Sequence, residues 1–122
     1  MKKWNSGQRF ETAREWIIAS GLSNGIRGGL DPAVLDTLAE CCVKRRGIWS
    51  LRKTAPKDTR RFLVWKAFNI ARHSAQWGNL APWNETLTAE LLRANDDDRT
   101  LFDRAFDQFA AIAAQIQKQK RG

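Results

Sequence analysis

Hydrophobic residues recur along most of the chain with the 3.6-residue period of an amphipathic helix, and strand-like alternation is not evident. A first helix is predicted from a cap at Ser6 to a stop at Gly21, with the inward residues Phe10, Ala13, Trp16 and Ile17. The glycine-rich stretch "GLSNGIRGG" follows as a loop. Asp31–Pro32 then supplies an N-cap and a proline at the first helical position.

The second helix is expected to run to Gly47. Its inner face would hold Leu35, Leu38, Ala39 and Cys42. Its last turn would carry Lys44, Arg45 and Arg46, which suit the negative end of the helix dipole. A connection over residues 47–57 follows, with Pro56 near its end.

Three more helices are predicted in the second half. Asp58 caps the longest, which ends at Gly78 and whose apolar stripe is Leu63, Ala67, Ile70, Ala71, Ser74 and Trp77. Phe62 and Trp65 widen this stripe, whereas Phe68 falls to one side, and we expect the helix to be central. A short helix follows at about 86–94, with Leu87 and Leu91 inward. The last starts near Asp98, with the stripe Leu101, Ala105, Phe109, Ile112 and Ile116.

These elements predict an all-α fold, a single-domain bundle of about five helices. The chain of 122 residues has the size of one domain, so residues 1–122 are expected to form a single helical domain. Within it, a basic segment covers residues 44–72 and a short basic C-terminal tail covers 118–122. No apolar run reaches the roughly 18 residues of a membrane span, so we expect no membrane and a cytoplasmic location.

Candidate chemistry is sparse. Cys41 and Cys42 are adjacent, so a disulfide between them would close a strained ring, and His73 is the only histidine available to a zinc site. No nucleophile and base are visibly paired, and the chain is not expected to be an enzyme or to carry a metal or cofactor. The acids at 96–98 suit a helix N-terminus better than a cation site. The loop at 21–29 lacks the lysine and hydroxyl residue that end a P-loop.

Positive charge is segregated along the chain. The formal net charge is +8, and residues 41–81 contain ten Lys and Arg against one acid, Asp58. The remaining 81 residues hold eleven basic and twelve acidic groups, so the whole positive excess lies in one third of the sequence. Such a distribution gives the surface potential a direction, which is typical of proteins that bind polyanions.

The basic segment is therefore the candidate binding site for nucleic acid. If the chain turns back at Pro56, its charges would converge at one corner of the bundle. Trp49 lies between two basic clusters, where an indole could stack on an unpaired base, so RNA or single-stranded DNA is favoured over duplex. The predicted contact residues are Lys44, Arg45, Arg46, Trp49, Arg52, Lys53, Lys57, Arg60, Arg61, Lys66 and Arg72. The plainer alternative is a solvated surface with Trp49 in the core.

Two functions fit this profile. The first is a non-catalytic nucleic-acid-binding protein with little sequence readout, working as a subunit of a larger nucleoprotein assembly. In size, expected helix content and charge the chain resembles the small helical subunits of CRISPR ribonucleoprotein effectors, although no motif is shared. A standard helix-turn-helix is disfavoured, because acids open the would-be recognition helix. The alternative is a protein-interaction module, such as a phage or mobile-element inhibitor or adaptor, docking on an acidic partner or on copies of itself.

Overall fold

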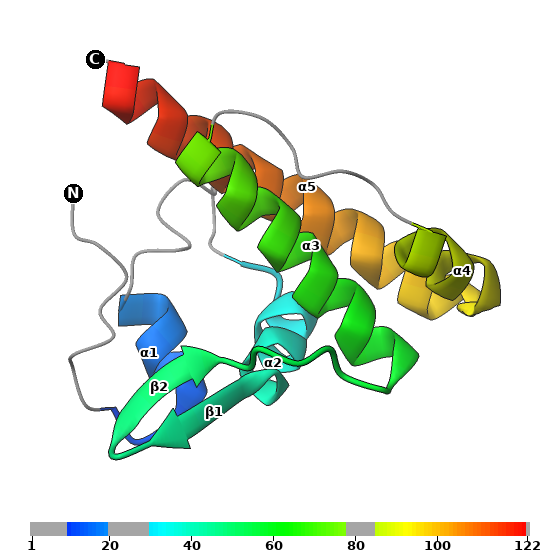
Figure 1. Ribbon diagram of the computed structural model, residues 1–122, viewed down its shortest axis with the longest axis horizontal. Coiled ribbons are helices and arrows are strands. Elements are labelled where there is room, and N and C mark those ends of the chain that lie inside the picture. Colours follow the sequence, from blue (N-terminus) through cyan, green and yellow to red (C-terminus); the bar gives the residue numbers. More distant parts are fainter. Residues whose placement is uncertain (1–9, 20–29, 78–84, 122) are drawn as a thin grey trace.

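A computed structural model describes residues 10–19, 30–77 and 85–121. These parts contain five helices and one two-stranded antiparallel sheet (Figure 1). The elements in chain order are α1 (Ala13–Ala19), α2 (Pro32–Glu40), β1 (Cys42–Arg45), β2 (Ile48–Leu51), α3 (Thr59–Trp77), α4 (Glu85–Arg93) and α5 (Asp96–Arg121). The fold is mostly helical, as predicted, but the sheet means that it is not purely all-α.

The largest difference from the prediction is the end of the second helix. Helix α2 stops at Glu40 rather than near Gly47, and the next residues form a β-hairpin of β1 and β2. Its two-residue turn consists of Arg46 and Gly47, whose φ angles are 53° and 78°. Positive φ at both central positions is the type I′ geometry, which matches the twist of a hairpin and which no helix can contain.

The predicted helix starts at Asp31 and Asp58 are confirmed by capping hydrogen bonds. An Asp31 carboxylate oxygen accepts from the backbone N–H of Ala33 at 2.9 Å. An Asp58 carboxylate oxygen accepts from the backbone N–H of Arg61 at 3.0 Å. Each cap satisfies a first-turn donor that has no partner within its own helix.

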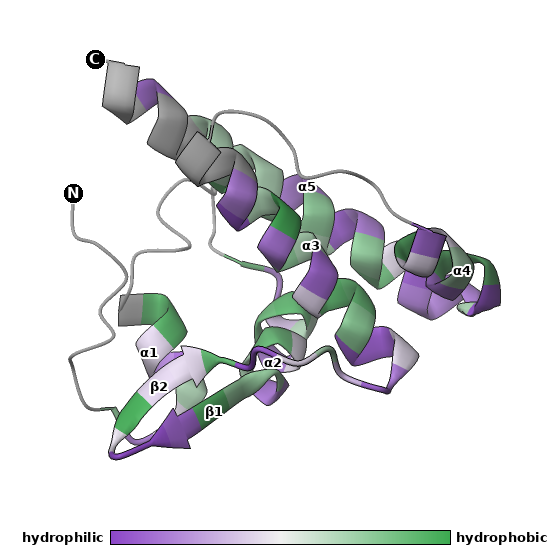
Figure 2. Cartoon of the chain, viewed as in Figure 1, coloured by the Kyte–Doolittle hydropathy of each residue, from purple (hydrophilic) through white to green (hydrophobic). Residues whose placement is uncertain are grey.

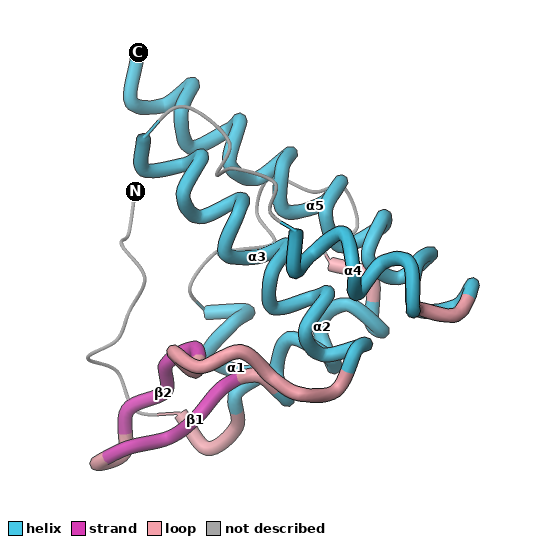
Figure 3. Tube along the Cα trace, turned by 45° about the vertical axis from the view of Figure 1, so that its right-hand side comes forward, coloured by secondary structure: helices cyan, strands magenta, loops and turns pink. Residues whose placement is uncertain are grey.

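The core is built where α3 and α5 lie side by side, with α1 and α2 packed at one end (Figures 1 and 3). Phe68 of α3 meets Phe109 of α5 edge to face, with ring centroids 5.4 Å apart. The placement of Phe68 to one side of the buried stripe was therefore wrong, since its side chain is buried. The predicted inward residues Leu63, Ala67 and Ile70 are buried.

The acids before the last helix take the predicted structural role. Asn95 caps α5 by accepting from the backbone N–H of Asp98 at 2.8 Å. Asp96, Asp97 and Asp98 occupy the first turn, where carboxylates complement the helix dipole. Helix α5 thus begins two residues earlier than predicted.

Several sequence predictions lie outside the described residues. These are Ser6 itself, the stops at Gly21 and Gly78, and the glycine-rich loop. The side chains of Ser74, Trp77 and Ile116 are also outside the description. The first helix begins later than predicted, however, because α1 starts at Ala13 and Thr12 caps it by accepting from the backbone N–H of Glu15 at 3.1 Å, so Phe10 lies before the helix. None of the helices in the described parts has the length and apolar run that a membrane crossing needs.

Candidate functional site

The hairpin turn carries the first group of predicted contact residues. Lys44, Arg45 and Arg46 are all exposed there, and the turn is strongly hydrophilic in Figure 2. Within the described parts of the chain, no carboxylate lies within the 4.0 Å ion-pair distance of any of the three. Three positive charges at one end of the molecule thus lack an ion-pair partner among the described residues.

Trp49 holds the hairpin against the bundle. Its indole Nε1 donates to the backbone carbonyl of Phe10 at 2.8 Å, and its half-buried ring packs on the hydrophobic core. Opposite it in the sheet stands Lys44, whose Nζ lies 5.6 Å from the ring centroid as a cation–π contact. The indole therefore has a structural partner on its N–H and a cation near its ring. This geometry gives no support to the stacking role on which the preference for single strands depended.

The loop between β2 and α3 carries the second group. Lys53 and Lys57 are exposed, while the half-buried Arg52 turns its guanidinium to the backbone carbonyl of Thr54 at 2.8 Å. The backbone of Arg52 attaches the start of the loop to α3, because its carbonyl accepts a hydrogen bond from Trp65 Nε1 at 2.9 Å. Pro56 is buried and fixes the loop at a second point. The loop is therefore tied down at both ends with its lysines outward.

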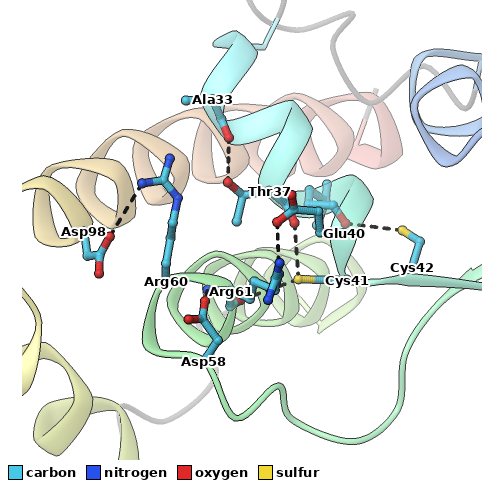
Figure 4. A network of polar contacts seen from close by, with 10 residues as sticks. Ala33, Thr37, Glu40, Cys41, Cys42, Asp58, Arg60, Arg61 and Asp98 are labelled. Carbon is cyan, nitrogen blue, oxygen red and sulfur yellow. Dashed lines mark hydrogen bonds and ion pairs between the residues drawn. The ribbon is translucent and has the colours of Figure 1, made fainter.

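Arg60 and Arg61 have carboxylate partners in the fold (Figure 4). Arg61 Nε donates to a Glu40 carboxylate oxygen at 2.9 Å, joining α3 to the end of α2. This hydrogen bond, followed by the Glu40 charge, raises the pKa of Arg61. Arg60 lies 3.6 Å from an Asp98 carboxylate oxygen, joining α3 to α5. These two arginines are held by ion pairs, so they add less positive potential than the sequence indicated.

Lys66 and Arg72 do not continue a strip along α3. Six residues of an α-helix correspond to about 600° of rotation, so their side chains leave the helix about 120° apart. Arg72 instead donates to Asn69 at 2.8 Å and lies 5.9 Å from the centroid of the Phe68 ring. Lys66 and Arg72 therefore do not form one continuous strip along α3.

The remaining basic residues line one edge of the molecule, formed by the hairpin and the following loop (Figures 1 and 3). From the turn to the base of the hairpin, where Cys42 pairs with Leu51, the edge extends about 10 Å at 3.4 Å per residue. Charges thus spread along an edge instead of converging at a corner. We call this the basic edge, and its residues are Lys44, Arg45, Arg46, Arg52, Lys53 and Lys57.

The cysteines behind the basic edge are poorly suited to chemistry. Burial raises the pKa of the Cys41 thiol to about 11 and that of the Cys42 thiol to about 12. Both thiols are therefore protonated at neutral pH, whereas the thiolate is the nucleophile and metal ligand. No three His, Cys, Asp or Glu side chains come together as a metal site in the described residues.

Two features of this site were missed from the sequence. The hairpin had only a weak local signal, because "VKRRGIWSL" has a glycine followed by Ile48 and Trp49, with Val43 as the one β-branched residue before it. The ion pairs of Arg60 and Arg61 had no such signal, since their partners Asp98 and Glu40 lie 38 and 21 positions away along the chain.

Comparison with known proteins gives no match, since no family model fits the chain and neither a curated protein nor a solved structure is detectably similar.

Proposed function

We propose that the protein is a non-catalytic nucleic-acid-binding protein that holds a phosphate backbone along the basic edge. One observation carries the proposal. Six Lys and Arg residues lie within one hairpin and one loop, and none has a carboxylate within ion-pair distance among the described residues. Elsewhere in the described chain, arginines on α1, α3, α4 and α5 do have such partners, whereas Lys66, Arg72 and Lys118 are scattered basic residues that have none there.

Binding would be driven by counterion release. Each phosphate that a Lys or Arg neutralises frees condensed cations, so the affinity falls linearly with salt on logarithmic axes. The basic edge is long enough to follow about three nucleotides of one strand at 3.4 Å per charge. This mode of contact positions a backbone and reads little sequence.

The opposite end of the molecule is acidic, which fits a subunit of a larger nucleoprotein assembly. Residues 85–107 contain seven Asp and Glu against three Arg, and α4 with the start of α5 lies away from the hairpin (Figure 1). One end would thus contact nucleic acid while the other is left for a neighbouring subunit. An effector small subunit of the CRISPR type is one assembly that needs these two surfaces.

The proposal is tested by fluorescence anisotropy with labelled single-stranded RNA, single-stranded DNA and duplex DNA, from about 50 to about 300 mM salt. We expect dissociation constants of about 1–100 µM at physiological salt and a steep negative slope on logarithmic axes. Unlabelled poly-glutamate serves as the acidic polypeptide competitor. If no nucleic acid binds at the lowest salt, the proposal is wrong. If poly-glutamate displaces nucleic acid at equal charge concentration, docking on an acidic protein becomes the better account.

A further inference from the structure

Arg46 adopts a backbone conformation that its side chain disfavours. At φ 53° it lies in the left-handed region, which glycine, asparagine and aspartate occupy far more easily than a long side chain. A non-glycine residue held there costs stability, and such residues cluster at functional sites. Asn-Gly is the favoured pair for this turn, yet the chain has Arg-Gly.

No contact within the described fold compensates Arg46 for this conformation. Its side chain is exposed, and no hydrogen bond or ion pair joins it to another described residue. It stands at the outermost point of the hairpin beside Arg45, the last residue of β1. The Arg46 side chain is therefore free of polar contacts within the described residues and open to a ligand.

The hairpin has the dimensions of a groove-binding ribbon. A two-stranded β-ribbon fits the major groove of B-DNA, which is about 12 Å wide and 8.5 Å deep. The strands here are four residues each, so the turn stands about 10 Å beyond the base of the hairpin. Trp49, which pairs with Lys44, packs on the core and hydrogen-bonds to Phe10, so only the Arg45–Ile48 pair and the turn extend beyond the anchored part of the ribbon.

We propose that the tip of this hairpin docks at the major groove of duplex DNA, with the Arg46 side chain contacting base edges and Arg45 the flanking phosphates. The inference rests on the proposed function and narrows its ligand to a B-form duplex. The planar guanidinium offers paired donors that match guanine O6 and N7. Lys53 and Lys57 would then hold the backbone beside the groove. Duplex RNA is a poor ligand because its major groove is too narrow for side chains to read.

The first test is Arg46→Asn, which removes the guanidinium and supplies the residue that the turn prefers. We expect its Tm to be unchanged or higher than that of the wild type, which separates loss of binding from loss of fold. Affinity for a duplex DNA should fall about tenfold, as for one lost base contact. Affinity for the same sequence as a single strand should fall less. The matched control is Lys57→Asn, which removes one charge from the loop and should weaken both ligands equally.

The second test compares ligands for the wild type at one salt concentration. Duplex DNA should bind at least about tenfold more tightly than duplex RNA. A DNA duplex whose cytosines carry glucosylated 5-hydroxymethyl groups, which fill the major groove, should bind as weakly as the RNA. If all these ligands bind with the same affinity and Arg46→Asn behaves like Lys57→Asn, the groove proposal is overturned. The proposed binding of the phosphate backbone along the basic edge would then still stand. If none binds at low salt, both proposals fail together.

Discussion

At the residue scale, the basic side chains of this protein differ in whether a carboxylate lies within ion-pair distance. Arg61 is hydrogen-bonded to Glu40 at 2.9 Å, whereas Arg45 has no carboxylate within ion-pair distance among the described residues. Both appeared equivalent in the sequence, since a charge count contains no information on partners that are distant along the chain. Because Arg60 and Arg61 are paired with carboxylates, the candidate site is reduced to the hairpin and the loop that follows it.

Trp49 gives a residue-scale prediction. Replacing it by Phe or by Leu removes the hydrogen bond to Phe10 and leaves that carbonyl unpaired, so each variant should lose about 1–3 kcal/mol of unfolding free energy. Urea titration measures that loss. Nucleic-acid affinity, measured where the variants are folded, should be the same for Phe and Leu.

Comparing the Phe and Leu variants of Trp49 distinguishes a structural role of the indole from stacking on a base. Phe keeps an aromatic ring and Leu does not, and a stacked base contributes about 1–3 kcal/mol. A Leu variant that binds at least tenfold more weakly than the Phe variant would restore stacking as the role of Trp49.

The cysteines give a prediction on pH. Burial raises the pKa of Cys41 to about 11, so in the unfolded chain this thiol ionises at a lower pH than in the folded protein. Its contribution to stability is complete below the unfolded pKa and is lost as the pH rises toward the folded value. Between about pH 8 and about pH 10.5, the wild type should lose more unfolding free energy than Cys41→Ala does. Equal losses in the two proteins, by urea titration, would argue against the raised pKa.

At the element scale, the helices were predictable and the hairpin was not. Helix α3 matches its predicted start, because Asp58 caps it and its apolar residues keep the helical period over five turns. Residues 42–45 also fit a helical pattern, since basic residues suit a helix C-terminus. The pairing of β1 with β2 and the packing of Trp49 on the core outweighed that local preference.

Asp58 gives an element-scale prediction because it has two separable properties. It caps α3, and it is the one acid in the basic segment. Asp58→Asn keeps a capping oxygen and removes the charge, so stability should change little while nucleic-acid affinity rises at low salt. Asp58→Ala loses the cap as well and should cost about 1 kcal/mol. Thermal unfolding and anisotropy would check the pair, and equal Tm values for both variants would contradict the capping role.

At the scale of the whole molecule, positive and negative charges that are segregated along the sequence are also separated in space by the fold. The basic edge at the hairpin and the acidic segment formed by α4 and the start of α5 lie at different ends of the α3–α5 pair (Figure 1). The sequence predicted the segregation of charge, and its list of basic residues includes all six of the basic edge. The sequence did not predict how these residues are arranged. The turn at Arg46–Gly47 places three charges at the end of the hairpin, and ion pairs with carboxylates hold Arg60 and Arg61.

The central claim is that charge at the basic edge, and not net charge, binds nucleic acid. The most direct measurement compares two triple variants by anisotropy at one low salt concentration. One carries Arg45→Gln, Lys53→Gln and Lys57→Gln at the basic edge. The other carries Arg93→Gln, Arg99→Gln and Lys118→Gln, all exposed on α4 and α5, and loses the same formal charge. We predict that the first loses at least about tenfold in affinity and the second less than about threefold. Equal losses would contradict the account.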